Sequence, residues 1–139
     1  MAEGRTNLDN MYYKQYTVLR KIHMGPEIEQ LPAVFYRSAS GTEPVRDWLK
    51  DLPVTDRRIV GFDIHLVEFG WPIGMPLVRS LKGGLWEVRS NLTDGRIARV
   101  IFCVSDGCMV LLHGFVKKTQ KTPNADLETA RKRQKEIEQ

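Results

Sequence analysis

Four cationic side chains in the second half of the chain have the types and spacing needed for chemistry on a phosphate. They are Arg89, Arg99, His113 and Lys117. An arginine guanidinium matches phosphate oxygens because its N–H donors form a planar fork. A histidine, or a lysine whose pKa is lowered by neighbouring cations, can accept and donate protons near neutral pH. The set therefore predicts a site for a phosphate-containing substrate.

These residue types suit the cleavage of RNA by its own 2′-hydroxyl group, which attacks the adjacent phosphate. A protein must deprotonate that hydroxyl, stabilise the charged phosphorane and protonate the leaving 5′ oxygen. We expect Arg89 and Arg99 to bind the phosphate, and His113 or Lys117 to transfer protons. The sequence contains no CxxC, HExxH, GxSxG or phosphate-binding glycine loop, so we predict no metal site and no cofactor.

The net charge of +4 is concentrated around these residues. Residues 79–121 carry eight basic and three acidic side chains. A basic cluster of this kind is typical of proteins that bind a polyanion, although lysines and arginines also protect edge strands from aggregation. Further RNA contacts are expected from four more basic residues: Lys82, Arg96, Lys118 and Lys121.

Predicted strands must position the four candidates. Strands are expected over residues 77–81, 85–91, 97–104 and 108–116, separated by glycine-containing turns. Side chains alternate between the two faces of a strand, so each of the last three predicted strands has one group of side chains on the same face. In chain order the groups are Leu85, Glu87 and Arg89, then Arg99, Ile101 and Cys103, and then Met109, Leu111, His113, Phe115 and Lys117. If the strands align, the four candidates converge near one end of the sheet, and a slip of one residue would separate them.

Helices and one more strand complete the expected domain. Residues 33–37 predict a short strand. One helix is expected to have Thr42 or Glu43 near its cap and to end before Pro53. A second helix should run from a Thr55 cap to Gly70, and a last one should follow a Thr122 cap. The order β-α-α-β-β-β-β-α predicts an α+β domain, with an antiparallel sheet covered by helices on one face and free on the other. We expect the folded domain to cover residues 32–139. Residues 1–31 are expected to be an extension outside it, in which residues 10–23 could form a short helix.

Three side chains in the core carry separate expectations. Asp63 projects into the apolar stripe of the second helix, so it needs a partner, for which an arginine or backbone N–H groups are the candidates. Cys103 and Cys108 are expected to be free thiols in a reducing compartment. No apolar run is long enough to span a membrane and the N-terminus lacks a signal-peptide pattern, so a cytoplasmic location is expected.

Several stretches resemble a known family. VFYRSASGTEPVRDWL, FGWPIGMPLVRSLKGGLWEVRS, RIARVIF and LLHGFVKKTQKTP resemble the phage Gp49-like branch of the HigB toxins, in the RelE/ParE superfamily of type II toxin–antitoxin systems. The resemblance covers residues 32–138. It implies a RelE-like fold and a growth-inhibiting toxin that cleaves mRNA, commonly on the ribosome. It also implies a cognate helix-turn-helix antitoxin, through which the toxin–antitoxin complex could bind operator DNA.

The resemblance also assigns site residues by position. Arg89 lies in GLWEVR, Arg99 in IARVIF, and His113, Lys117 and Lys118 in HGFVKK. The chain departs from the RelE pattern because it has no catalytic tyrosine at the C-terminal end, so His113 or a lysine would take that role. Two alternatives stay open: a ParE-like inhibitor of DNA gyrase that cuts no RNA, and a non-catalytic component that represses its operon with an antitoxin.

Overall fold

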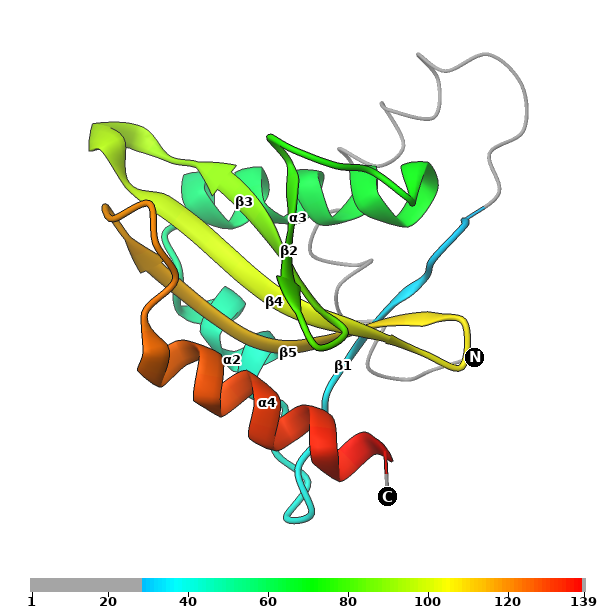
Figure 1. Ribbon diagram of the computed structural model, residues 1–139. Helices are drawn as coiled ribbons and strands as arrows, with labels where there is room; N and C mark the ends of the chain where they lie inside the picture. The colour runs from blue at the N-terminus through cyan, green and yellow to red at the C-terminus, as the bar shows by residue number, and fades with distance from the viewer. Residues whose placement is uncertain (1–28, 139) are drawn as a thin grey trace.

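The computed structural model describes residues 29–138, and Figure 1 shows a sheet with helices on both sides. The elements are β1 (Ala33–Phe35), α2 (Pro44–Asp51), α3 (Val54–Gly70), β2 (Val78–Lys82), β3 (Leu85–Asn91), the short 3-10 helix η1 (Thr93–Gly95), β4 (Ile97–Ser105), β5 (Cys108–Lys117) and α4 (Asn124–Glu138). This order confirms the predicted β-α-α-β-β-β-β-α domain. The helix considered for residues 10–23 lies outside the described residues.

The five strands form one sheet in the order β1-β5-β4-β3-β2. Strands β2 to β5 are antiparallel neighbours, as their short turns require. β1 pairs with β5 in parallel, Ala33 opposite Met109 and Phe35 opposite Leu111. The expectation of an all-antiparallel sheet is therefore wrong at this edge, because two helices and three strands separate β1 from β5 and no hairpin sets their relative direction. β5 lies between β1 and β4 and is therefore an interior strand.

One face of the sheet packs against α2 and α3. Val45 and Leu49 from α2 and Ile64 from α3 are fully buried there, in a cluster with Val88 and Phe102 from the sheet. The same cluster also includes Val100 of the sheet, and Trp86 packs against it. This core packs one face of the sheet against two helices. A binding site on the sheet can therefore lie only on the opposite face.

The opposite face is not free, which corrects the sequence-based expectation. Ala130 of α4 is fully buried there, and Leu127 and Ile137 pack against a cluster that includes Ile101 and Leu112 of the sheet. Figure 1 shows α4 in front of the strands, with α2 and α3 behind them. The narrow apolar stripe of α4 was visible in the sequence, and burying it against the sheet removes its apolar surface from water.

The helix ends differ in detail from the predicted caps. Glu43 precedes α2 and Pro44 opens it, as expected. α3 begins at Val54, so Thr55 lies inside its first turn instead of capping it. α4 begins at Asn124, and the Thr122 hydroxyl is engaged by a carboxylate of β3. The last turn of α2 is closed by Arg57, which donates to the carbonyl oxygens of residues 49, 50 and 52.

The surroundings of Asp63 differ from the expectation, whereas both cysteines agree with theirs. Asp63 is partly buried, and burial raises the pKa of its carboxyl, while the nearby Ser90 hydroxyl of β3 acts in the opposite direction. Within the described part of the chain, the expected partner, an arginine or backbone N–H groups, is not found there, and the buried Ser90 hydroxyl itself forms no hydrogen bond. Both cysteines are free thiols, and burial raises the pKa of Cys103 to about 11. Among the described residues, no helix is long and apolar enough to cross a membrane.

Candidate functional site

A bulge in β5 determines which side chains face α4. Ile101 pairs with His113 but the next residue, Phe102, pairs with Leu111, so Leu112 is an extra residue in β5. Met109 and Leu111 consequently pack with α2 and α3, whereas Leu112 and Phe115 pack on the α4 side. The expectation that Met109 and Leu111 share a face with His113 is wrong, because a bulge breaks the alternation of side chains along a strand.

The strand register brings the predicted arginines together. Arg89 of β3 lies directly opposite Arg99 of β4. Arg99 in turn lies opposite Phe115 of β5, whose neighbours two residues away are His113 and Lys117. The predicted convergence of these four side chains at one end of the sheet is therefore found in the structure. A further arginine, Arg79 of β2, lies opposite Glu87 in the next pair of strands.

Residues 118–121 connect β5 to α4, and we call them the strap. Arg79 Nη1 donates to the carbonyl oxygen of Gln120 at 3.3 Å. Arg89 donates to the same carbonyl at 3.4 Å and to the Gln120 side-chain oxygen at 2.9 Å. Arg99 donates to the carbonyl of Lys121 at 3.0 Å and to that of Thr119. Three guanidinium groups from three adjacent strands thus hold one short segment.

A buried carboxylate lies beside this cluster. Glu87 is fully buried and accepts a 2.7 Å hydrogen bond from Arg89 Nη1 through one oxygen. Its other oxygen accepts a 2.7 Å hydrogen bond from the Thr122 hydroxyl. A buried charge requires such partners, since leaving it unpaired is costly. Glu87 therefore joins the arginine cluster to the residue that follows the strap.

Arg99 is the most enclosed of the candidates. It is one of the largest fully buried side chains, at 0% exposure. Its guanidinium lies 5.6 Å from the centre of the Phe115 ring, which suits a cation–π contact. Burial, followed by the nearby charge of Arg89, lowers the pKa of Arg99, while Glu87 acts in the opposite direction. In this conformation the strap and Phe115 separate Arg99 from any bound substrate.

His113 and Lys117 meet at Asp126 in the first turn of α4. His113 Nε2 is 2.7 Å from Asp126 Oδ1, and Lys117 Nζ is 4.0 Å from Asp126 Oδ2. The other ring nitrogen of His113 lies 3.5 Å from Arg133 Nη1 of α4. An arginine can only donate, so this contact favours the tautomer in which Nε2 carries the proton and Nδ1 has the lone pair. The Lys117 side chain is 50% exposed, and that of His113 is 19% exposed.

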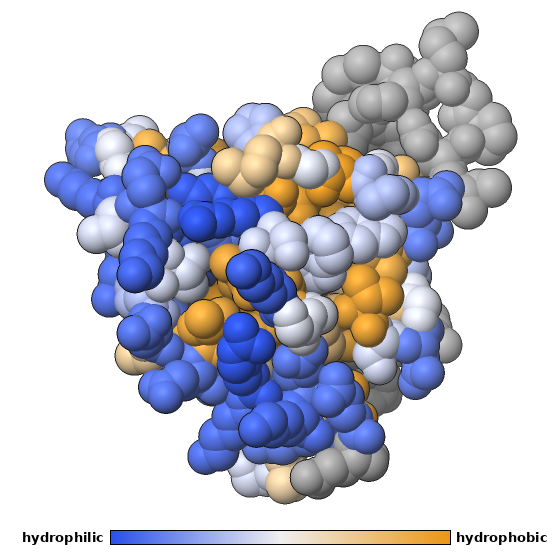
Figure 2. Space-filling view, in the orientation of Figure 1, coloured by the Kyte–Doolittle hydropathy of each residue, from blue (hydrophilic) through white to orange (hydrophobic). Residues whose placement is uncertain are grey.

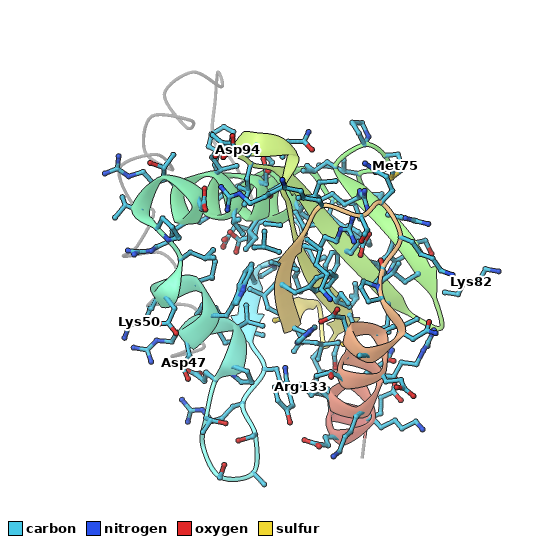
Figure 3. All side chains as sticks on the ribbon, turned by 90° about the vertical axis from the view of Figure 1, so that its left-hand side faces the viewer. Asp47, Lys50, Met75, Lys82, Asp94 and Arg133 are labelled. Atoms are coloured by element: carbon cyan, nitrogen blue, oxygen red, sulfur yellow. The ribbon has the colours of Figure 1, made fainter. Side chains whose placement is uncertain are left out.

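The four residues expected to add RNA contacts fall in different places. Lys118 and Lys121 are exposed on the strap, beside the cluster. Lys82 is exposed at the β2–β3 turn, at the opposite end of β3 from Arg89, and Figure 3 shows it projecting outward. Arg96 instead forms two hydrogen bonds to Asp56 of α3, at 3.0 and 3.4 Å. Arg96, like Lys82, thus lies away from the cluster, and the RNA contact expected of it stays a prediction.

The surface around the site is polar. Figure 2 shows mainly hydrophilic side chains over α4 and at the end of the sheet where the strap lies. Figure 3 shows Arg133 extending from α4, where its guanidinium lies 5.6 Å from the ring centre of Tyr36. No group of three or more His, Cys, Asp or Glu side chains capable of holding a metal ion occurs within residues 29–138.

Sequence reasoning left four contributors to this site unassigned: Arg79, Gln120, Thr122 and Asp126. Arg79 was counted among the basic residues, and its place opposite Glu87 could have been found by pairing the two strands across the Gly83-Gly84 turn. No pattern in the sequence pairs Asp126 with His113 or Lys117. The contacts of Gln120, Thr122 and Asp126 depend on how the chain turns after β5, and no local pattern specifies that turn.

Most of the elements around the site lie within a match to a known protein family. The sequence profile of the phage-derived Gp49-like proteins matches residues 47–135, well over half of the chain and nearly all of the elements around the site. The chain belongs to this family. Gp49-like proteins are HigB-type, RelE-like toxins, so family membership places the chain among the toxins of toxin–antitoxin systems in general. No curated protein matches the sequence.

Proposed function

We propose that this Gp49-like protein is the toxin of a type II toxin–antitoxin system and acts as an endoribonuclease on mRNA, in association with the ribosome in the cytoplasm. The observation that carries the proposal is the convergence of Arg89, Arg99, His113 and Lys117 at one end of the sheet. These are the groups that the in-line reaction requires, and family membership gives the context of a toxin.

The proposed reaction needs only the RNA and these side chains. The 2′ oxygen forms a bond to the adjacent phosphorus as its proton passes to a base. The bond from phosphorus to the 5′ oxygen breaks as an acid protonates that oxygen. The products are a 2′,3′-cyclic phosphate and a 5′-hydroxyl end. Arg89 and Arg99 stabilise the charge of the phosphorane, which is greater than that of the starting phosphodiester.

The geometry favours Lys117 as the acid that protonates the 5′ oxygen. Its side chain is half exposed, so a substrate can reach it without rearrangement. Asp126 lies beside both Lys117 and His113 and fixes the orientation of the imidazole, as a carboxylate does in other proton-transfer pairs. His113 is the proposed base through Nδ1, and Arg133 must move from its 3.5 Å contact to uncover that atom.

The proposed partners follow from this role. mRNA and the ribosome would meet the exposed lysines of the strap, Lys118 and Lys121, because phosphate contacts supply most of the affinity for nucleic acid. A cognate helix-turn-helix antitoxin would neutralise the toxin by covering the same basic end of the sheet. Operator DNA would be bound through that antitoxin.

The proposal is tested with the purified full chain in two assays run in parallel. In a translation extract, mRNA should be cut within the coding sequence and carry cyclic phosphate at the new 3′ ends. In a DNA gyrase supercoiling assay, the same preparation should have no effect. Intact mRNA together with inhibited supercoiling would contradict the proposal and identify a ParE-like gyrase inhibitor.

A further inference from the structure

The contacts between the strap and the sheet consist of an unusual set of hydrogen bonds. Arg79, Arg89 and Arg99 direct their guanidinium groups at the carbonyl oxygens of Thr119, Gln120 and Lys121 and at the side-chain oxygen of Gln120. All of these acceptors are neutral oxygens gathered within three consecutive residues. The arrangement resembles the way in which several arginines surround the oxygens of one phosphodiester group.

The cluster has more positive than negative charge. Of the carboxylates, Glu87 and Asp126 are the two that act on Arg99. Glu87 contacts Arg89, and Asp126 already contacts His113 and Lys117. The carbonyl oxygens of the strap accept hydrogen bonds from the guanidinium groups but carry only partial charges, and the buried Nε of Arg99 has no hydrogen-bond partner among residues 29–138. An anion at the same position would balance the excess charge, which the uncharged oxygens of the strap cannot do.

The strap is held in place by its two ends and by the hydrogen bonds from the three arginines. Residues 118–121 are all exposed. Among the described residues, none of the main-chain hydrogen bonds outside helices and strands involves these four. Lys117 before the strap belongs to β5, and Thr122 after it is anchored on Glu87. The strap can therefore lift from the arginines while β5 and α4 stay in place.

We propose that Arg79, Arg89 and Arg99 form one phosphate-binding site and that the strap occupies it in the free protein. RNA binds by displacing the strap, so that phosphate oxygens replace the carbonyl oxygens of residues 119–121. Arg79 is thereby a third phosphate-binding residue beside Arg89 and Arg99. This inference rests on the proposed function, and it explains how the enclosed Arg89 and Arg99 can act on a substrate.

Two variants separate the site from its internal occupant. Gln120→Ala removes one strap contact and leaves all three arginines, so it should strengthen the binding of RNA about threefold to tenfold. Arg79→Ala removes a charged phosphate ligand, so it should weaken binding about tenfold and reduce the slope of log affinity against log salt by about 0.7. Arg58→Ala, at an exposed arginine of α3 on the other side of the sheet, is the matched control and should change neither.

The measurement uses a single-stranded RNA whose 2′ positions are methylated, so that it binds without being cleaved. Its affinity for the full chain is measured by fluorescence anisotropy over a range of salt concentrations. Trypsin cleavage after Lys118 and Lys121 is followed in the same complexes, and the proposal predicts that cleavage there becomes faster when RNA binds, because the strap lifts from the arginines. A strap that serves only to join β5 to α4 would show unchanged or slower cleavage, and that result would overturn the proposal.

The outcomes also separate this inference from the proposed ribonuclease activity. If RNA binds with the predicted dependence on Arg79 and Gln120 but unmodified RNA stays intact in a translation extract, the site stands and the ribonuclease proposal fails. If RNA is cleaved but Gln120→Ala does not strengthen binding and Arg79→Ala does not weaken it, the ribonuclease proposal stands and the inference fails. Failure of the methylated RNA to bind the unaltered protein also overturns the inference.

Discussion

Lys117 is the candidate whose change is most informative at the scale of single residues. Its half-exposed side chain lies at the end of β5, 4.0 Å from Asp126. Replacing it with alanine removes a proton donor while leaving the core untouched. We predict that Lys117→Ala lowers the single-turnover rate of mRNA cleavage about a hundredfold or more, with an unchanged unfolding midpoint.

The matched control for this prediction is Lys50→Ala, at an exposed lysine of α2, shown in Figure 3. It should cleave at the normal rate. Arg99→Ala is less informative than Lys117→Ala, because Arg99 is fully buried and its truncation would also leave a cavity and unpaired carbonyl groups. Cleavage at the normal rate by Lys117→Ala would show that Lys117 is not the acid.

Thr122 is predicted to be a structural residue of the same region. Its hydroxyl donates to a fully buried oxygen of Glu87, so Thr122→Val leaves that oxygen without a partner in a side chain of similar shape. We expect the free energy of unfolding to fall by about 1–3 kcal/mol, measured by urea denaturation. Thr119→Val, at an exposed threonine of the strap, should cost much less, and equal losses in the two variants would contradict this role.

Asp63 gives a prediction for the dependence of stability on pH. Burial raises the pKa of its carboxyl in the folded state. The folded protein therefore binds more protons than the unfolded chain, and stability is lost as pH rises from the ordinary aspartate value of about 3.9 toward the folded-state pKa. Asp63→Asn should stabilise the protein at pH 7, and the gain should vanish below about pH 3.9. Thermal melts at both pH values test this, and a gain of equal size at low pH would contradict it.

At the scale of elements, the packing of α2 on β5 depends on one glycine. A Cβ atom built on Gly114 would lie 2.4 Å from the ring of Trp48 in α2. Gly114 lies between His113 and Phe115, so a shift of this contact also moves the site. Gly114→Ala should lower the free energy of unfolding by about 1–3 kcal/mol, measured by denaturant titration.

Gly74→Ala is the control for that experiment, since no neighbouring atom lies within 4 Å of the position that a Cβ would take there. It should change stability far less than Gly114→Ala. If Gly114→Ala were as stable as the unaltered protein, α2 would have to move freely relative to β5, and the packing described for this face would be wrong.

The elements also show how far a sequence can specify such a site. Alternation and turn signals correctly predicted that Arg89, Arg99 and His113 face the same side. They missed the bulge at Leu112, because Leu111 and Leu112 are both apolar and both fully buried, on opposite faces. An apolar pair gives no signal of which residue is extra, so the positions of Met109 and Leu111 could not be predicted.

At the scale of the whole molecule, the order of elements and the family were accessible from sequence, but the coverage of the site was not. The apolar side chains of α4, Leu127, Ala130 and Ile137, are present in the sequence, but the face that they cover follows only from the tertiary fold. The strap contacts are also tertiary: residues 119–121 meet side chains 20 to 41 positions away. The structure thus replaces an open basic face by a cationic site enclosed by the strap and α4.

The central claim is that this Gp49-like toxin cuts mRNA with the cationic end of its sheet. The most direct measurement is the mapping of transcript 5′ ends in cells after brief induction of the full chain or of Lys117→Ala at equal protein levels. The account predicts new 5′-hydroxyl ends within coding sequences for the unaltered toxin, and their loss in the variant. Growth arrest with intact transcripts in both strains would contradict it.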